Sequence, residues 1–165
     1  MGVEIERKFL VNREVFKSLE TNDSYYIAQG YILNTPEKVV RIRVTEDKSY
    51  ITVKGANIGA SRPEFEYLVP KMDAEIMLKT MCEDIVVKTR HIFHIFGDVW
   101  EIDEFHGDNE GLIVAECEIP SEDYELRLPK WIIEEVTGQE RFYNNSLANY
   151  PFSEWLDKLL VYEDL

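Results

Sequence analysis

Cysteine, glycine and long apolar runs are all scarce in this chain of 165 residues. It has two cysteines, Cys82 and Cys117, and 8 glycines. The two cysteines have no metal-type spacing, so we expect free thiols in a reducing cytoplasm rather than a disulfide framework or a zinc site. No apolar run approaches the roughly 20 residues that a membrane helix needs. The chain starts directly on a charged segment, so we expect neither contact with a membrane nor a signal peptide.

Bases are also few, with 18 Lys and Arg against 32 Asp and Glu, for a net charge of -14. This balance argues against a nucleic-acid partner, because a phosphate backbone is bound by a broad basic surface. It leaves room for a small polyanion, provided that the bases are gathered in one place and the acids hold divalent cations. The glycine-rich phosphate loops of P-loop and Rossmann proteins are missing from the sequence.

The hydrophobic content of 45% and the length predict one globular domain, residues 1–165, with a substantial core. Alternation of polar and apolar residues predicts eight strands, at residues 3–11, 25–33, 39–44, 50–55, 62–69, 85–94, 99–105 and 112–119. Helical spacing and capping residues predict helices at 14–19 (capped by Asn12), 74–82 (capped by Asp73) and 129–136, and a helix that starts at 121–123. Further turns of this helical tail are expected at 144–148 and 151–160. We expect Leu147, Trp155, Leu156 and Leu159 to pack the last two.

Seven of the eight predicted strands carry charge on one face only. In the first, Glu4, Glu6 and Lys8 fall on one side, because successive side chains of a strand point to opposite faces. The acids placed in this way are Glu4, Glu6, Glu64, Glu66, Glu101, Asp103, Glu116 and Glu118. The bases are Lys8, Arg41, Arg43, Lys54, Lys88 and Arg90.

Two architectures fit this division of the strands. In one, the apolar faces meet in the centre and the charges face solvent. In the other, the charges face inward and the helices pack outside on the apolar faces. We favour the second: an α+β fold with an eight-stranded antiparallel β-barrel. Its charged interior must be wet and occupied. Paired carboxylates suit Mg²⁺ or Mn²⁺, and arginine and lysine suit phosphate oxygens.

With these motifs in order, the chain resembles the CYTH domain family, also called triphosphate tunnel metalloenzymes, and most of all its short single-domain bacterial members. The matching residues include Glu4-Ile5-Glu6-Arg7-Lys8, Gln29-Gly30-Tyr31, Arg41-Ile42-Arg43, Thr52-Val53-Lys54, Ser61-Arg62, Glu64-Phe65-Glu66, Lys88-Thr89-Arg90, Asp103, Glu116-Cys117-Glu118 and Arg141. It departs from the family pattern at Glu140, Phe142 and Tyr143, which puts the contribution of the tail to phosphate binding in doubt.

The resemblance implies an eight-stranded tunnel, a divalent metal and a substrate that contains a triphosphate. The implied metal ligands are Glu4, Glu6, Asp103, Glu116 and Glu118, with Glu64, Glu66 and Glu101 as further acids that could assist. The implied phosphate ligands are Lys8, Arg41, Arg43, Lys54, Arg62, Lys88, Arg90 and Arg141. Catalysis would fall mainly to Glu4, Glu6, Lys8 and Arg43.

Metal-dependent hydrolysis of tripolyphosphate to diphosphate and phosphate is the function that we predict. Two alternatives stay open: an adenylyl cyclase of class IV, which makes cyclic AMP from ATP, and a phosphate-binding module without catalysis. The exposed edges of the predicted barrel and the habit of the family favour a homodimer. The physiological triphosphate, the preferred metal and the number of metal ions are left open.

Overall fold

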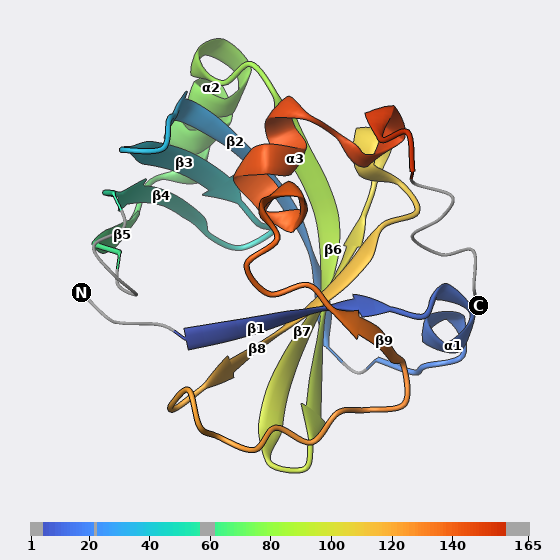
Figure 1. Ribbon diagram of the computed structural model, residues 1–165. Coiled ribbons are helices and arrows are strands. Elements are labelled where there is room, and N and C mark those ends of the chain that lie inside the picture. The colour runs from blue at the N-terminus through green and yellow to red at the C-terminus, as the bar shows by residue number, and fades with distance from the viewer. Residues whose placement is uncertain (1–4, 22, 57–61, 158–165) are drawn as a thin grey trace.

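The fold is an α+β arrangement built on one antiparallel sheet of nine strands (Figure 1). This computed structural model describes residues 5–21, 23–56 and 62–157. The strand order is β5-β4-β3-β2-β6-β7-β8-β1-β9, and each pairing is antiparallel. The strands are β1 (Ile5–Val11), β2 (Ser24–Asn34), β3 (Val39–Val44), β4 (Ser49–Lys54), β5 (Glu64–Leu68), β6 (Ile85–Ile95), β7 (Asp98–Phe105), β8 (Ile113–Ile119) and β9 (Ile132–Glu135). Closure of this sheet into a barrel stays a prediction.

Few helices accompany the sheet. They are α1 (Arg13–Lys17), α2 (Lys71–Met81) and α3 (Asn144–Asn149), with 3-10 turns η1 (Gly107–Asn109), η2 (Glu140–Phe142) and η3 (Phe152–Glu154). Asn12 caps α1 as predicted, because its side chain accepts hydrogen bonds from the backbone of Glu14 and Val15. The predicted cap of α2 is wrong: Pro70 holds the N-cap position, and Asp73 lies in the first turn of the helix. No helix in the described ranges is long and apolar enough to cross a membrane.

Strand β9 replaces a helix that the sequence predicts over residues 129–136. Ile132–Glu135 pairs with β1 in antiparallel register. The backbone N–H of Val136 donates to the carbonyl of Lys8 at 2.8 Å. Without β9, one side of β1 would lack hydrogen-bond partners, and this long-range pairing outweighs the local helical signals.

One face of the sheet is apolar and packs beneath α1 and the segment before β9. A buried cluster there joins Phe9, Phe16, Trp100, Ile102 and Trp131 with their neighbours. The rings of Trp100 and Trp131 meet edge to face at 5.2 Å. Helix α2 contacts β2, β3 and β4, and Figure 1 shows it at the opposite end of the sheet from α1. These two helices therefore match the prediction that helices cover the apolar strand faces.

The C-terminal segment, residues 136–157, packs on the opposite face of the sheet from α1 and α2. A second buried cluster joins Leu10, Phe105 and Val114 of the strands to Phe142 and Trp155 of this segment. The prediction that all helices pack outside is therefore wrong for α3. It is also wrong that Leu156 packs the tail, because Leu156 is 100% exposed. Leu159 lies outside the described residues.

Candidate functional site

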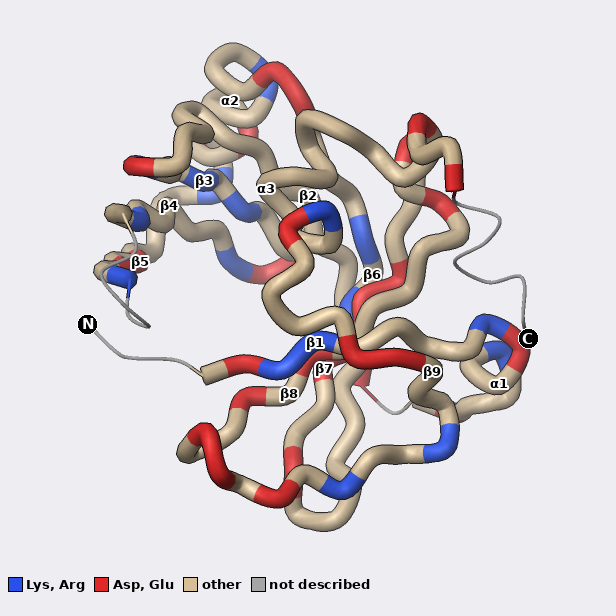
Figure 2. Tube along the Cα trace, in the orientation of Figure 1, with Lys and Arg blue, Asp and Glu red and all other residues tan. Residues whose placement is uncertain are grey.

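The charged residues of the strands gather on one face of the sheet, whose centre is buried. We call it the charged face and define it by Lys8, Gln29, Arg41, Arg43, Thr52, Lys54, Glu64, Glu66, Lys88, Arg90, Glu101, Asp103, Glu116 and Glu118. Lys88 is 0% and Asp103 is 2% exposed, and Lys8, Arg41 and Arg90 are also buried. The alternative with charges facing solvent is therefore wrong. Figure 2 marks the basic positions on β1, β3 and β6.

Asp103 on β7 lies between two cations of the neighbouring strand β6. Its Oδ2 accepts from Lys88 Nζ at 2.7 Å and from Arg90 Nη2 at 3.0 Å, and its Oδ1 accepts from Arg90 Nε at 2.8 Å. Arg90 and Asp103 are Cα partners, so both side chains point to the same face. Arg90 also pairs with Glu101 at 2.9 Å. Both oxygens of Asp103 thus serve cations of the protein.

Burial and charge pull the ionisation of this cluster in opposite directions. Burial alone would raise the pKa of Asp103, but the charges and hydrogen bonds of Arg90 and Lys88 outweigh it and hold this pKa far below its usual range. Burial lowers the pKa of Lys88 to about 7. The negative charge of Asp103 acts in the opposite direction but does not outweigh burial, and the positive charge of Arg90 lowers this pKa further. An anion placed beside Lys88 would therefore favour its protonated form.

Lys8 on β1 joins the carboxylates of β8 to the C-terminal segment. Its Nζ lies 3.1 Å from Glu116 Oε1 and donates to the carbonyl of Phe142 at 3.3 Å. The same Nζ lies 5.1 Å from the ring centre of Tyr143. Asn144 Oδ1 in turn accepts from Lys88 Nζ at 2.8 Å. The departures from the family pattern at Phe142 and Tyr143 therefore fall where the tail meets the cations of the charged face.

Two further cations pair with acids at the β5 edge of the sheet. Arg41 lies 3.4 Å from Glu66 and also donates to Thr52 at 3.2 Å. Lys54 lies 3.8 Å from Glu64. Burial lowers the pKa of Lys54, and the positive charge of Arg41 lowers it further. Glu64 and Glu66 thus act here as counter-ions of the bases.

Arg43 on β3 has a neutral partner instead. Its Nε donates to Gln29 Oε1 on β2 at 2.9 Å, and Gln29 Nε2 donates to the Tyr31 hydroxyl at 3.1 Å. Burial lowers the pKa of Arg43 to about 10, and the positive charges of Arg41 and Arg90 add to this effect. Within the described ranges, no carboxylate lies within 4.0 Å of the Arg43 guanidinium.

The predicted metal ligands lie on β1 and β8. Glu6 and Glu118 are Cα partners, so two carboxylates face each other across the strand pair. Glu116 lies two residues before Glu118 on the same face, and Lys8 holds its pKa below the usual value although burial alone would raise it. Among the residues with described positions, no three His, Cys, Asp or Glu side chains are arranged to hold a metal ion. Glu4, the fourth predicted acid of this group, lies outside the described residues.

The donor set nonetheless fits a hard divalent cation. Like charges directly opposite each other on neighbouring strands destabilise a sheet, and a cation between Glu6 and Glu118 would relieve this repulsion. Carboxylate oxygens are the ligands that Mg²⁺ and Mn²⁺ prefer.

Two predicted phosphate ligands have other partners. Arg62, two residues before β5, donates from Nε to the carbonyl of Gly55 at 2.6 Å, although its charge still acts on Lys54. Arg141 donates from Nη1 to both oxygens of Asp157, at 2.9 and 2.8 Å, and lies over the ring of Trp155 at 4.4 Å. In this structure Arg141 therefore stabilises the tail.

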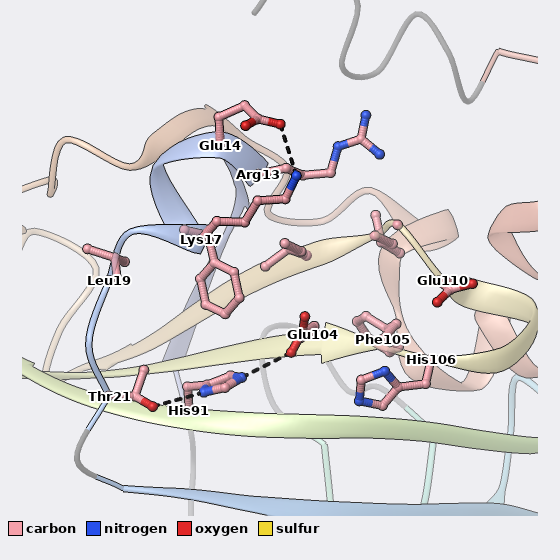
Figure 3. Close-up of a pocket in the computed structure, with 14 residues that line it drawn as sticks. Arg13, Glu14, Lys17, Leu19, Thr21, His91, Glu104, Phe105, His106 and Glu110 are labelled. Carbon is pink, nitrogen blue, oxygen red and sulfur yellow. Dashed lines mark hydrogen bonds and ion pairs between the residues drawn. The ribbon is translucent and has the colours of Figure 1, made fainter.

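A cavity of about 660 Å³ lies away from the charged face, between α1 and the ends of β6 and β7 (Figure 3). His91 on its floor pairs with Glu104 at 3.3 Å and with Thr21 at 3.3 Å. Its lining mixes acids, bases and apolar side chains, among them Arg13 and Phe16. We assign the functional site to the charged face instead, because there β1, β3, β4, β6, β7 and β8 bring phosphate-binding cations together with carboxylates.

A nine-stranded antiparallel sheet that gathers cations and carboxylates on one face defines the class of this protein: an α+β protein with a charged sheet face. The model of the CYTH domain matches residues 2–148, and the chain belongs to this family.

Characterised relatives resemble the chain over nearly its whole length. The inorganic triphosphatase of Acetivibrio thermocellus is 45% identical over 156 residues, which cover 94% of this chain and 99% of the relative. The inorganic triphosphatase of Nitrosomonas europaea is 33% identical over 150 residues, 88% of this chain and 96% of the relative. The crystal structure of an inorganic triphosphatase superposes with a TM-score of 0.66 at 30% identity, covering 90% of this chain and 95% of that one.

Sequence reasoning missed the neutral residues that hold the cations. Gln29 is fully buried and contacts Arg43. It carries no charge, so the sequence identifies it as part of a family motif but predicts no role for it. Asn144 also belongs to the residues that match the family, Asn144-Asn145-Ser146-Leu147-Ala148, but the sequence gives it no role at the site. For Gln29 a signal was present: it shares strand parity with Tyr31, and a buried amide needs hydrogen-bond partners. For Asn144 no local signal existed, because its contact with Lys88 spans 56 residues.

Proposed function

We propose that this protein is a divalent-metal-dependent inorganic triphosphatase, which converts tripolyphosphate and water to diphosphate and phosphate. The observation that carries the proposal is the convergence of six cations from β1, β3, β4 and β6 on one face of the sheet, four of them buried and two half-buried, beside the carboxylates of β1 and β8. The 45% identical inorganic triphosphatase of Acetivibrio thermocellus supports the same activity. Arginine forks and ammonium groups match the oxygens of a short phosphate chain.

Positioning and charge neutralisation would supply most of the catalysis. In the proposed arrangement, Arg41, Arg43 and Arg90 bind the phosphate oxygens and hold the chain along the sheet. Lys8 lies nearest the proposed metal ligands, so it neutralises charge that develops on the leaving diphosphate. When water attacks the terminal phosphorus, a new P–O bond forms and the water gives up a proton. The bridging P–O bond breaks, and its electron pair stays on the diphosphate.

Glu4, Glu6, Glu116 and Glu118 would hold one or two Mg²⁺ or Mn²⁺ ions. Bound there, the metal would neutralise phosphate oxygens and favour the attack of water. Asp103 belongs to the set of ligands predicted from sequence, yet its present contacts give it a second role, as counter-ion of Lys88 and Arg90. Glu101 pairs with Arg90 in the same way. Arg62, Lys54 and Lys88 complete the proposed basic wall.

The test is phosphate release from tripolyphosphate by the purified protein with Mg²⁺, with Mn²⁺ and with a chelator. We expect hydrolysis with either metal and none with the chelator. Arg43→Ala should lower kcat by about 100-fold, the usual cost of removing one group that stabilises the transition state. With ATP, cyclic AMP as the product would instead support a cyclase. Tight metal-independent binding without turnover would support a binding module, and either result would overturn the proposal.

A further inference from the structure

Arg43 differs from the other five cations of the charged face in the partner that it has. Lys8, Arg41, Lys54, Lys88 and Arg90 each lie within 4.0 Å of a carboxylate. For Arg43 the described residues supply a neutral amide, the side chain of Gln29, at 2.9 Å. Among the residues that the structure describes, Arg43 is thus the one of these six cations that has no carboxylate within 4.0 Å.

Gln29 is built into the sheet in a way that fixes its orientation. It is fully buried in the middle of β2, and its Cα partners are Arg43 on β3 and Val86 on β6. Both ends of its amide are used: the oxygen accepts from Arg43, and the nitrogen donates to the hydroxyl of Tyr31. Rotation of the amide by 180° would point its N–H group at the N–H of Arg43, so the bond to Tyr31 keeps the oxygen toward the arginine.

The bond uses only the Nε–H of Arg43. A guanidinium has five N–H donors, and the four on its two terminal nitrogens form the fork that binds phosphate oxygens. An amide oxygen accepts a hydrogen bond without cancelling the charge. A carboxylate at this place would cancel it and would compete with an incoming anion.

We propose that Gln29 is a positioning residue, which orients Arg43 through its Nε and leaves the positive charge of Arg43 uncompensated for the triphosphate. This inference rests on the proposed function and deepens it. It identifies Arg43 as the cation that can bind the phosphate chain without breaking an ion pair with a described carboxylate. The other five must share or exchange a counter-ion when substrate enters. Gln29 itself does not touch the substrate.

The inference predicts opposite effects on stability and on binding for one isosteric change. In Gln29→Glu, the new carboxylate accepts from Arg43 and takes over the bond to Tyr31, whose hydroxyl then becomes the donor. The half-buried guanidinium of Arg43 gains a counter-ion, so we expect the melting temperature without ligand to rise by about 2–4 °C. Binding of tripolyphosphate, measured by calorimetry without metal, should weaken by about 10- to 100-fold, the range for losing a charge-assisted bond.

Two further variants separate positioning from other effects. Gln29→Met has a similar length but no polar atoms, so it should lower both the melting temperature and the affinity for tripolyphosphate. Gln29→Glu should therefore restore stability relative to Gln29→Met without restoring binding, a pattern that a merely structural role would not give. Gln139→Glu makes the same change of charge at an exposed position and should alter neither quantity.

Several outcomes would overturn the inference. It fails if Gln29→Glu binds tripolyphosphate as tightly as the unaltered protein, if Gln29→Glu melts at a lower temperature, or if Gln139→Glu weakens binding equally. Unaltered protein that binds but does not hydrolyse tripolyphosphate would refute the proposed enzyme and leave the role of Gln29 standing. Unaltered protein that does not bind it at all would refute both.

Discussion

At the scale of single residues, Asp103 is the shared counter-ion of two buried cations. Its carboxylate bonds both Lys88 and Arg90, and all three side chains are buried. Asp103→Asn would leave two buried cations without their shared acid. We expect the free energy of unfolding at pH 7 to fall by about 3–5 kcal/mol, the usual cost of breaking a buried ion pair from one side. Urea unfolding monitored by tryptophan fluorescence measures this change.

The pH dependence of the same variant follows from the low pKa of Asp103. A carboxyl group whose pKa is lower in the folded than in the unfolded state adds stability above its unfolded value, about 3.9, and this stability is lost as the pH falls further. The difference in the free energy of unfolding between Asp103→Asn and the unaltered protein should therefore become smaller below about pH 4. Glu104→Gln, on the same strand but on the opposite face, is the control. Equal losses in the two variants would show that Asp103 has no special role.

At the scale of elements, the contact between β2, β6 and the end of α2 is too close for a side chain at Gly30. A Cβ at this position would lie 2.7 Å from Ile85 Cδ1 and 2.8 Å from Cys82 Cβ. Gly30→Ala should therefore lower the free energy of unfolding by about 1–3 kcal/mol through overpacking. Ile85→Val removes the nearer methyl group, so the double variant should lose less than the sum of the two single losses. Additive losses in thermal or urea unfolding would contradict this account.

Strands and helices differ in how well the sequence predicts them. All eight predicted strands form, because alternation such as that of Arg41 and Arg43 is a local signal with a period of two. Strand β9 was missed, because Ile132–Glu135 does not alternate and becomes a strand only through pairing with β1. The capping of α1 by Asn12 was local and predictable. The prediction that all helices pack outside was wrong for α3, because Asn144 at its start contacts Lys88 on the charged face. No signal near Asn144 in the sequence predicts this contact.

For the candidate site, the sequence predicted which charges share a face but not how they pair. The segregation of Lys88, Arg90 and Asp103 on one face follows from strand parity. That Asp103 binds both cations depends on the register of β6 against β7, which the parity of one strand does not fix. The neutral residue Gln29 could not be selected by a search for charge. Prediction therefore succeeded for the chemistry of the charged face and failed for its internal bonding.

At the scale of the whole molecule, the C-terminal segment and the sheet form one cooperative unit. Phe142 and Trp155 share a buried cluster with Leu10 and Val114 of the sheet. The carbonyl of Phe142 also accepts from Lys8, so the apolar cluster and the charged face meet at this residue. Loosening the tail should therefore destabilise the entire fold rather than release a detached segment.

Two neighbouring residues of the tail test this cooperation. Trp155 is 3% exposed and meets the rings of Phe142 and Phe152 edge to face at 5.3 and 5.2 Å, whereas Leu156 is 100% exposed. Trp155→Ala should lower the free energy of unfolding by about 3–5 kcal/mol, the usual cost of deleting a buried aromatic side chain. Leu156→Ala should change it by less than about 0.5 kcal/mol. Urea unfolding followed by circular dichroism of the sheet is the measurement. An unchanged midpoint in Trp155→Ala would mean that the sheet folds without its tail, and the bond from Lys8 to Phe142 would then contribute nothing to holding the charged face together.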